Sequence, residues 1–172
     1  MTILLTGGSA CGKSTYAEQI AVASAEPRIY LACMRPYGEE GEMRVVRHRK
    51  MRAGKGFETI EKYTKIWETD VPDGSTVLVE CLCNLTANEM FDDDGSKSDA
   101  ENSVIKGIKA LQQKAGTLII VTNDVGSDGS DYHPLTVSYV DALGRVNAKA
   151  AGLADTVIEM VCGIPIFLKG SL

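Results

Sequence analysis

The sequence opens with the short apolar run Thr2-Ile3-Leu4-Leu5-Thr6, which is followed at once by Gly7-Gly8-Ser9-Ala10-Cys11-Gly12-Lys13-Ser14-Thr15. The second segment has the complete spacing of a phosphate-binding loop: a glycine, four residues, then Gly-Lys-Ser. Such loops join a strand to a helix, and their backbone N–H groups and the helix N-terminus face phosphate oxygens. A strand-like run precedes this loop and a helical pattern over residues 16–23 follows it. We therefore predict that the chain binds a nucleoside triphosphate.

The residues of this loop have distinct expected roles. Lys13 is expected to reach the β- and γ-phosphates, and the hydroxyl of Ser14 is expected to bind Mg²⁺. A glycine-rich turn that matches the spacing by chance is the alternative, and the strand–loop–helix context argues against it. The expected nucleotide contacts in the loop are Gly7, Gly8, Ser9, Ala10, Cys11, Gly12, Lys13, Ser14 and Thr15.

The composition is that of an ordinary globular protein, with 172 residues of which 44% are hydrophobic and 24% charged. We predict a single nucleotide-binding domain over residues 1–172, long enough to bury roughly 70% of its unfolded surface. The net charge of −5 argues against a general nucleic-acid binder. No stretch reaches the ~18 apolar residues that a membrane-spanning helix needs, and no export signal is recognisable. We expect a cytoplasmic protein whose five scattered cysteines stay reduced.

Strand-like and helix-like segments alternate along the whole chain. This alternation predicts an α/β fold of the P-loop NTPase or RecA-like type, with a mostly parallel sheet and helices on both faces. Ligands of such sheets bind beyond the carboxyl ends of the strands. We expect helices near residues 13–23, 39–52, 82–91, 100–115 and 135–154, and strands at residues 2–6, 28–32, 57–60, 76–80, 117–122, 156–161 and 164–168.

Polar residues follow two of the predicted strands. Glu80 ends an apolar strand, where an acidic group can bind Mg²⁺ or accept a proton from an attacking hydroxyl. A solvated strand-end carboxylate is the alternative. Asn123 and Asp124 follow the strand over residues 117–122 and are further candidates at the same edge.

His48 is one of only two histidines and lies in Arg44-Val45-Val46-Arg47-His48-Arg49-Lys50. Neighbouring cations disfavour a further positive charge, so we expect a neutral ring that can act as a nucleophile. Arg44, Arg47 and Arg49 would also attract a polyphosphate. By composition alone, an exposed helix with a solvated charged face is the more common explanation of such a segment.

The ordered set of motifs resembles the bifunctional adenosylcobinamide kinase / adenosylcobinamide-phosphate guanylyltransferase family of cobalamin assembly. The similarity extends over nearly the whole chain, so residues 1–172 would form one P-loop nucleotide-binding transferase domain. The matching segments are Thr6 to Ser14, Tyr30 to Ala32 with Arg35-Pro36, Glu40 with Arg44, Val45 and His48, Glu80-Cys81-Leu82 with Asn88, Val121 to Gly126, Asp141 with Gly144 and Asn147, Ala154-Asp155, and Gly163 to Pro165 with Leu168-Lys169.

The resemblance implies two reactions on one scaffold. The aminopropanol hydroxyl of adenosylcobinamide would first take the terminal phosphoryl group of ATP or GTP, with Mg²⁺ as cofactor. His48 matches the guanylylated histidine of the family and would then carry GMP from GTP to adenosylcobinamide phosphate, which gives adenosylcobinamide-GDP. The resemblance further implies a homotrimer. The residues themselves predict that Lys13 and Glu80 act in catalysis, that Ser14 and Glu80 hold the metal, and that Arg47 and Arg49 contact the nucleotide.

The chain departs from the family pattern at several positions. Val140 stands where the family usually has arginine, Ala148 replaces a glutamine, Asp124 replaces a common glutamate, and the loop over residues 127–134 is unlike the usual form. These changes bear on substrate or subunit contacts more than on phosphate chemistry. Two other functions stay open: a different P-loop small-molecule kinase in which His48 is only a surface residue, and a non-catalytic nucleotide-binding switch.

Overall fold

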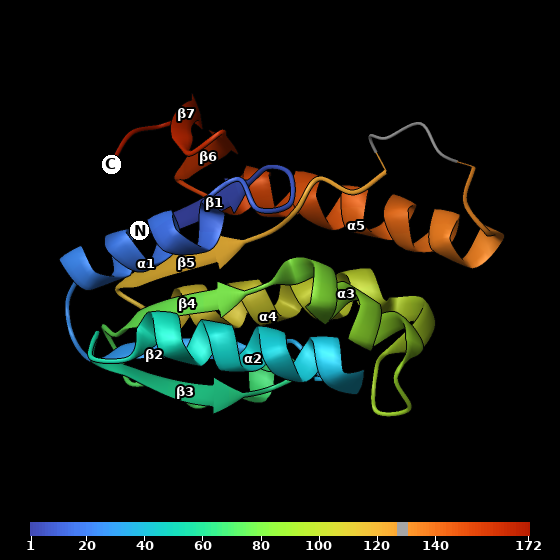
Figure 1. Cartoon of the computed structure of the whole chain (residues 1–172), viewed down its shortest axis with the longest axis horizontal. Coiled ribbons are helices and arrows are strands. Elements are labelled where there is room, and N and C mark those ends of the chain that lie inside the picture. The colour runs from blue at the N-terminus through green and yellow to red at the C-terminus, as the bar shows by residue number, and fades with distance from the viewer. Residues whose placement is uncertain (127–130) are drawn as a thin grey trace.

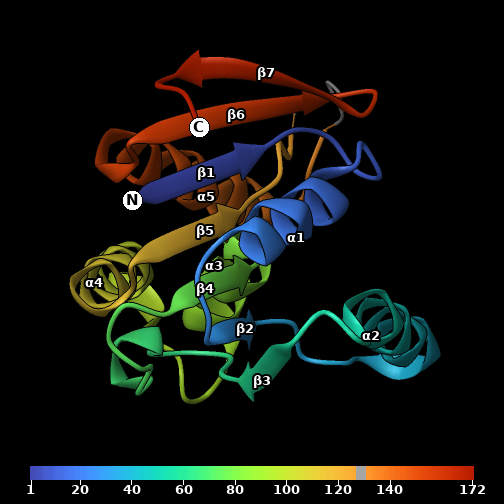
Figure 2. The same cartoon turned by 90° about the vertical axis from the view of Figure 1, so that its left-hand side faces the viewer.

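The computed structural model describes residues 1–126 and 131–172, except for the side chains of Glu40 and Arg44. Within these residues one seven-stranded sheet, in the order β3-β2-β4-β5-β1-β6-β7, runs through the centre of the molecule (Figures 1 and 2). Neighbouring strands of this sheet are parallel, except that β6 and β7 pair antiparallel. The predicted mostly parallel sheet is therefore confirmed. The strands are β1 (Thr2–Thr6), β2 (Arg28–Ala32), β3 (Phe57–Glu61), β4 (Thr76–Glu80), β5 (Thr117–Val121), β6 (Thr156–Val161) and β7 (Ile164–Lys169).

Helices cover both faces of the sheet, as predicted. Figure 2 shows α1 and α2 on one side and α4 and α5 on the other, and α3 packs with α4 and α5. Two short 3-10 helices were not predicted, because three residues are too few to show a periodic pattern. The helices are α1 (Lys13–Ala23), α2 (Gly38–Arg52), α3 (Leu82–Phe91), α4 (Ala100–Lys114) and α5 (Pro134–Leu153), and the 3-10 helices are η1 (Ile66–Glu68) and η2 (Lys97–Asp99).

The central strands are buried on both faces, which explains why they are continuous apolar runs in the sequence. Successive side chains of a strand point to opposite faces. In β1, Ile3 and Leu5 pack with Ala17 and Ala21 of α1, whereas Leu4 joins the core formed with α3, α4 and α5. The core on the α1 side holds this helix against the sheet, and this fixes the loop between β1 and α1.

Helix α2 differs from the other helices because most of its described side chains are exposed. Among these, Met43 is 65% and Val46 47% exposed, and only Arg52 is classed as buried. Figure 2 shows α2 standing to the side of β2 and β3. Helix α2 is therefore not a layer of the core, and its residues line one wall of a cavity instead.

Within the described residues, none of the helices combines the length and the apolar character needed to cross a membrane.

Candidate active site

The loop between β1 and α1 is shaped by Gly7. Its φ is +134°, and a Cβ atom at this position would lie 2.5 Å from the carbonyl oxygen of Met160 in β6. Only glycine therefore fits between this loop and the neighbouring strand. The N–H of Gly163, in the turn between β6 and β7, donates a hydrogen bond of 3.0 Å to the carbonyl of Cys11. The last hairpin of the chain thus supports the loop from the side.

Lys13 is buried inside this loop, with 6% of its surface exposed. Its Nζ donates hydrogen bonds to the carbonyl oxygens of Gly7 at 2.8 Å and Gly8 at 2.5 Å. Helix α1 begins at Lys13, so the free N–H groups of its first turn and the positive end of its dipole lie beside the ammonium group. The arrangement concentrates positive charge where the sequence predicts the phosphates.

Ser14 and Glu80 come from different elements and meet at the carboxyl edge of the sheet. The hydroxyl of Ser14 donates to Oε1 of Glu80 at 2.6 Å. A hydroxyl and a carboxylate beside a phosphate loop fit Mg²⁺, which prefers oxygen ligands and commonly keeps water and phosphate oxygens in its shell. The described residues contain no cluster of three or more His, Cys, Asp or Glu side chains that could hold a metal. The donor set therefore fits a magnesium ion shared with a nucleotide better than a metal held by protein alone.

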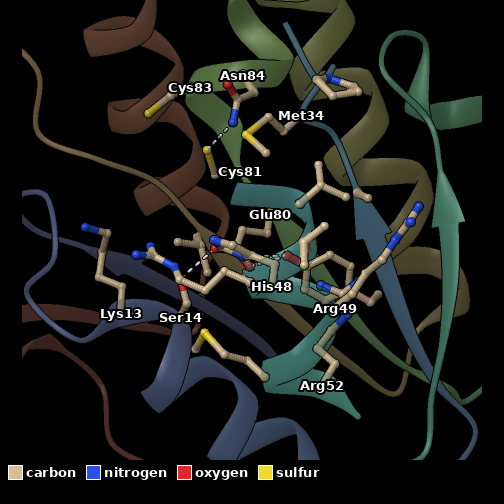
Figure 3. Close-up of a pocket in the computed structure, with 18 of the residues that line it drawn as sticks. Lys13, Ser14, Met34, His48, Arg49, Arg52, Glu80, Cys81, Cys83 and Asn84 are labelled. Atoms are coloured by element: carbon tan, nitrogen blue, oxygen red, sulfur yellow. Dashed lines mark hydrogen bonds and ion pairs between the residues drawn. The ribbon is translucent and has the colours of Figure 1, made fainter. Parts of the chain in front are cut away.

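His48 faces the same carboxylate from α2 (Figure 3). Its Nδ1 lies 3.4 Å from Oε2 of Glu80 and 3.2 Å from the hydroxyl of Tyr30. The Tyr30 hydroxyl donates a hydrogen bond to the same Oε2. The side chains of His48 and Glu80 are 16% and 10% exposed. Glu80 therefore links the phosphate loop to the imidazole through its two oxygens.

Burial and hydrogen bonding act in opposite directions on Glu80. Burial raises the pKa of this carboxyl, but the hydrogen bond and charge of His48, and then the hydrogen bonds from Ser14 and Tyr30, outweigh it and leave the pKa below its ordinary value. Burial, followed by the nearby charge of Glu80, raises the pKa of Tyr30. At neutral pH the pair is therefore a carboxylate and a protonated phenol.

The expectation that cations alone surround His48 is wrong on the Nδ1 side of the ring, where a carboxylate and a phenol are found. Arg49 pairs with Glu61 at 2.8 Å, in an exposed position at the cavity. The sequence could not indicate this, because Glu80 lies 32 residues further along the chain. It meets the ring because β4 lies beside β2, whose Tyr30 also contacts the ring, and because α2 lies along the same cavity.

A cavity of about 1240 Å³ joins these groups, between the phosphate loop, the strand ends and α2. Figure 3 shows Lys13 and Ser14 on one side of it, with Glu80 and His48 beside them. Asp124, in contrast, is exposed outside the cavity and contacts the loop through its N–H, 3.3 Å from the carbonyl oxygen of Gly7. The predicted residues that line the cavity are Ser9, Ala10, Cys11, Gly12, Lys13, Ser14, Thr15, Arg47, His48, Arg49, Glu80 and Asn123.

Other predicted positions lie elsewhere. The side chain of Arg44 is outside the described residues, as are residues 127–130 of the unusual loop. Val140 and Ala148 both lie on α5, and neither lines the cavity. The two departures from the family pattern on α5 thus lie outside the lining of the cavity.

Two further residues of the cavity have no role in the sequence analysis. The guanidinium of Arg52 lies 3.5 Å from the centre of the Tyr30 ring, and both side chains are almost fully buried. A weak pattern in the sequence could have identified each of them as a residue of the site. Arg52 comes four residues after His48 and therefore shares its helix face, and Tyr30 lies two residues before the end of a strand, on the face that Glu80 also occupies.

A family model described as cobinamide kinase / cobinamide phosphate guanyltransferase matches residues 3–168. The bifunctional adenosylcobalamin biosynthesis protein CobU of Escherichia coli strain K12 is 30% identical over 183 residues, with 98% of this chain and 100% of the relative covered. The bifunctional adenosylcobalamin biosynthesis protein CobP of Pseudomonas aeruginosa is 29% identical over 173 residues, with 99% and 98% covered. The range that the family model matches contains both the phosphate loop and His48.

Solved structures with lower identity share the fold. A protein from Pyrococcus horikoshii OT3 superposes with a TM-score of 0.53 at 10% identity, over 99% of this chain and 87% of that one. An ATPase from a bacterial type III secretion system superposes with a TM-score of 0.55 at 14% identity, over 93% of this chain and 51% of the ATPase. The chain has the P-loop NTPase fold that its first fifteen residues predict.

Proposed function

The chain belongs to the cobinamide kinase / cobinamide phosphate guanyltransferase family, and on this premise we propose that it catalyses both reactions in cobalamin biosynthesis. It would phosphorylate the aminopropanol hydroxyl of adenosylcobinamide with ATP or GTP, and then transfer GMP from GTP to the product through a guanylylated histidine. One observation carries the proposal. The phosphate-loop hydroxyl of Ser14 and the imidazole of His48 contact the two oxygens of one carboxylate, Glu80, within a single cavity.

For the kinase reaction, Lys13 would provide the positive charge that a transferring phosphoryl group requires. Ser14 and Glu80 would hold Mg²⁺, which when bound supplies charge compensation at the phosphates. The buried position of the Lys13 ammonium favours this role, because the interaction of a charge with phosphate is stronger away from water. The substrate hydroxyl would attack the γ-phosphorus from the open side of the cavity.

For the guanylyl transfer, His48 would attack the α-phosphorus of GTP and release pyrophosphate. The phosphate of adenosylcobinamide phosphate would then displace the histidine and take over the GMP group. Arg47 and Arg49 line the cavity on either side of His48 in sequence and would contact the phosphates. Asn123 also lines the cavity and remains a candidate for substrate contact. Arg44 and Asp124 are further candidates from the sequence alone.

We further infer that residues 1–172 work as one nucleotide-binding transferase domain, which the single sheet containing all the described strands supports. A homotrimer is proposed from the family resemblance, and apolar side chains exposed along β7 offer a surface for it. A cytoplasmic location is proposed because all five cysteines are free thiols, as expected in a reducing compartment.

The direct test detects a guanylyl group that is bonded to the protein. The protein is incubated with Mg²⁺ and GTP labelled at the α-phosphate, denatured, and assayed for an acid-labile protein-bound label. His48→Ala is expected to abolish the label while phosphorylation of cobinamide stays substantial, because the nucleophile serves only the second reaction. His133→Ala, which removes the other histidine of the chain, is the matched control and should keep the label.

Each other outcome has a definite meaning. Label retained in His48→Ala would refute the assignment of the nucleophile. A wild-type protein that transfers the γ-phosphoryl group without ever becoming labelled would be a different P-loop small-molecule kinase. Tight GTP binding with neither transfer would indicate a nucleotide-binding switch.

A further inference from the structure

Two side chains from two neighbouring strands, Tyr30 of β2 and Glu80 of β4, meet at one nitrogen of His48. We propose that Tyr30 is a positioning residue which, together with Glu80, holds Nδ1 of His48, so that Nε2 is the atom that becomes bonded to GMP. This inference rests on the proposed function and adds to it the reacting atom and the residue that selects it.

The hydrogen bonds around Nδ1 assign the tautomer of the ring. The Tyr30 hydroxyl has one proton, and it donates this proton to Oε2 of Glu80. Both the phenol oxygen at 3.2 Å and Oε2 at 3.4 Å are then acceptors toward Nδ1. Nδ1 therefore carries the ring proton, and the lone pair needed for nucleophilic attack is on Nε2.

The phenol is held in place by its own surroundings. The Tyr30 ring is 4% exposed and lies against the guanidinium of Arg52 on one face. Phe57 packs edge-on against it, with the ring centres 6.3 Å apart and the planes at 84°. Arg52 in turn donates to the hydroxyl of Thr59 at 3.4 Å. A phenylalanine at position 30 would keep these contacts and lose only the hydroxyl that reaches His48.

The two oxygens of Glu80 would thus serve different reactions. Oε1 accepts from Ser14 at the phosphate loop, and Oε2 lies beside Tyr30 and His48. The carboxylate can therefore orient the imidazole while it keeps its hydrogen bond with Ser14 of the phosphate loop. The Tyr30 hydroxyl contacts Oε2 of Glu80 and Nδ1 of His48, so it belongs to the histidine side of this arrangement.

The proposed step is balanced at each atom. The lone pair of Nε2 forms the N–P bond to the α-phosphorus of GTP, and the bond from that phosphorus to the bridging oxygen breaks, with its electron pair leaving on pyrophosphate. The ring becomes positively charged, and the carboxylate of Glu80 stabilises it through Nδ1–H. When a phosphate oxygen of the second substrate attacks phosphorus, the N–P electrons return to Nε2, and the Nδ1 proton stays in place throughout.

The first experiment identifies the nitrogen. The His133→Ala protein, in which His48 is the only histidine, is prepared with ¹⁵N in the imidazole ring and treated with GTP and Mg²⁺. Two-dimensional NMR that correlates phosphorus, ring nitrogens and ring protons is expected to show phosphorus coupled to Nε2. Coupling to Nδ1 would overturn the inference.

The second experiment tests Tyr30. Tyr30→Phe is expected to slow adduct formation in a single turnover by about tenfold, since a hydrogen bond at a charged group is lost, while the Kd of GTP changes less than about twofold. The adduct is also expected to appear partly on Nδ1, which a merely structural role of Tyr30 would not produce. Tyr139→Phe is the matched control, because it removes a phenol that donates to a backbone carbonyl, that of Cys83, at 3.2 Å.

The results separate the inference from the proposed function. If Tyr30→Phe forms the adduct at the wild-type rate and only on Nε2, then Tyr30 does not position the ring and the inference is wrong. If the wild-type protein forms no adduct at all, the proposed guanylyl transfer fails, and the inference fails with it. A wild-type adduct located on Nδ1 would contradict the inference alone.

Discussion

At the scale of single residues, the site depends on residues that each make more than one necessary contact. Glu80 is the clearest example, because its oxygens face Ser14 on one side and His48 and Tyr30 on the other. Gly7 is a second example, since it lets the phosphate loop turn and also lets it pass close to β6. A substitution at such a residue affects several contacts at once.

Gly7→Ala is expected to destabilise the protein by about 1–3 kcal/mol, because alanine is strained at a φ of +134° and its Cβ would lie 2.5 Å from the Met160 carbonyl. GTP binding should weaken as well, since the loop must move to relieve the contact. Urea unfolding and GTP titration measure the two effects.

Gly8→Ala is the control for this prediction, because a Cβ at position 8 meets nothing within 4 Å. It should leave the free energy of unfolding within about 0.5 kcal/mol of the wild type. Equal effects of the two substitutions would show that the contact with Met160 does not constrain the loop.

At the scale of elements, the helices differ in whether they pack into the core or line the cavity. Helix α4 has a pronounced apolar face and is packed against η1, α3 and α5, so it belongs to the core. Helix α2 has hardly any apolar face and instead holds His48 and Arg52 over the cavity. The stability of the fold and the geometry of the site therefore rest largely on different helices.

Gly107→Ala in α4 tests how closely this core is packed. A Cβ there would lie 2.2 Å from Cγ1 of Ile66 in η1, and Ile66 is 1% exposed and cannot swing into solvent. We expect a loss of about 1–3 kcal/mol in the free energy of unfolding, from overpacking, measured by urea denaturation.

Gly152→Ala in the last turn of α5 is the matched control, because its Cβ meets nothing within 4 Å. Here alanine should stabilise the protein, by up to about 1 kcal/mol, through its higher helix propensity. A Gly107→Ala protein as stable as the wild type would mean that η1 moves freely away from α4.

At the scale of the whole molecule, the sheet has two unlike edges. Beyond β1 the chain adds β6 and the antiparallel strand β7, which lies at the edge far from β3 (Figure 2). One face of β7 carries Ile164, Ile166 and Leu168, which are 63%, 43% and 59% exposed. An exposed row of apolar side chains on an edge strand is typical of a surface that another chain covers.

From the homotrimer proposed above, we predict that the wild-type protein sediments with a mass near three times 18.5 kDa, and from the exposed row on β7 that this strand contributes to the assembly. The double variant Ile164→Lys and Leu168→Lys should dissociate it to a single chain, because lysine is costly to bury in an interface. Sedimentation velocity and circular dichroism check the mass and the fold. Phe91→Lys, which replaces an exposed apolar residue at the end of α3, is the control and should keep the wild-type mass.

Most of the local structure was predictable from neighbouring residues. The strands at residues 2–6, 28–32, 76–80 and 156–161 and the helices at residues 13–23 and 82–91 have the predicted bounds. The other predicted elements differ by one residue at one end, except α5, which differs by one residue at each end. Helix α5 starts at Pro134 rather than residue 135, in accordance with the preference of proline for the first helical turn. Ligands bind beyond the carboxyl ends of the strands in parallel sheets. This rule predicted that the phosphate loop, Glu80, His48 and Asn123 would lie at one edge of the sheet.

The sequence by itself determined the phosphate loop, the order of strands and helices, and the resemblance to a family, because turn chemistry, periodicity and motif spacing are properties of nearby residues. Only the tertiary structure decided that Tyr30 and Glu80, rather than cations, face Nδ1 of His48, and that Asp124 lies outside the cavity. These contacts join residues from β2, β4 and α2. They depend on β2 lying beside β4 and on the path of α2 beside the sheet, which are set by packing over the whole molecule.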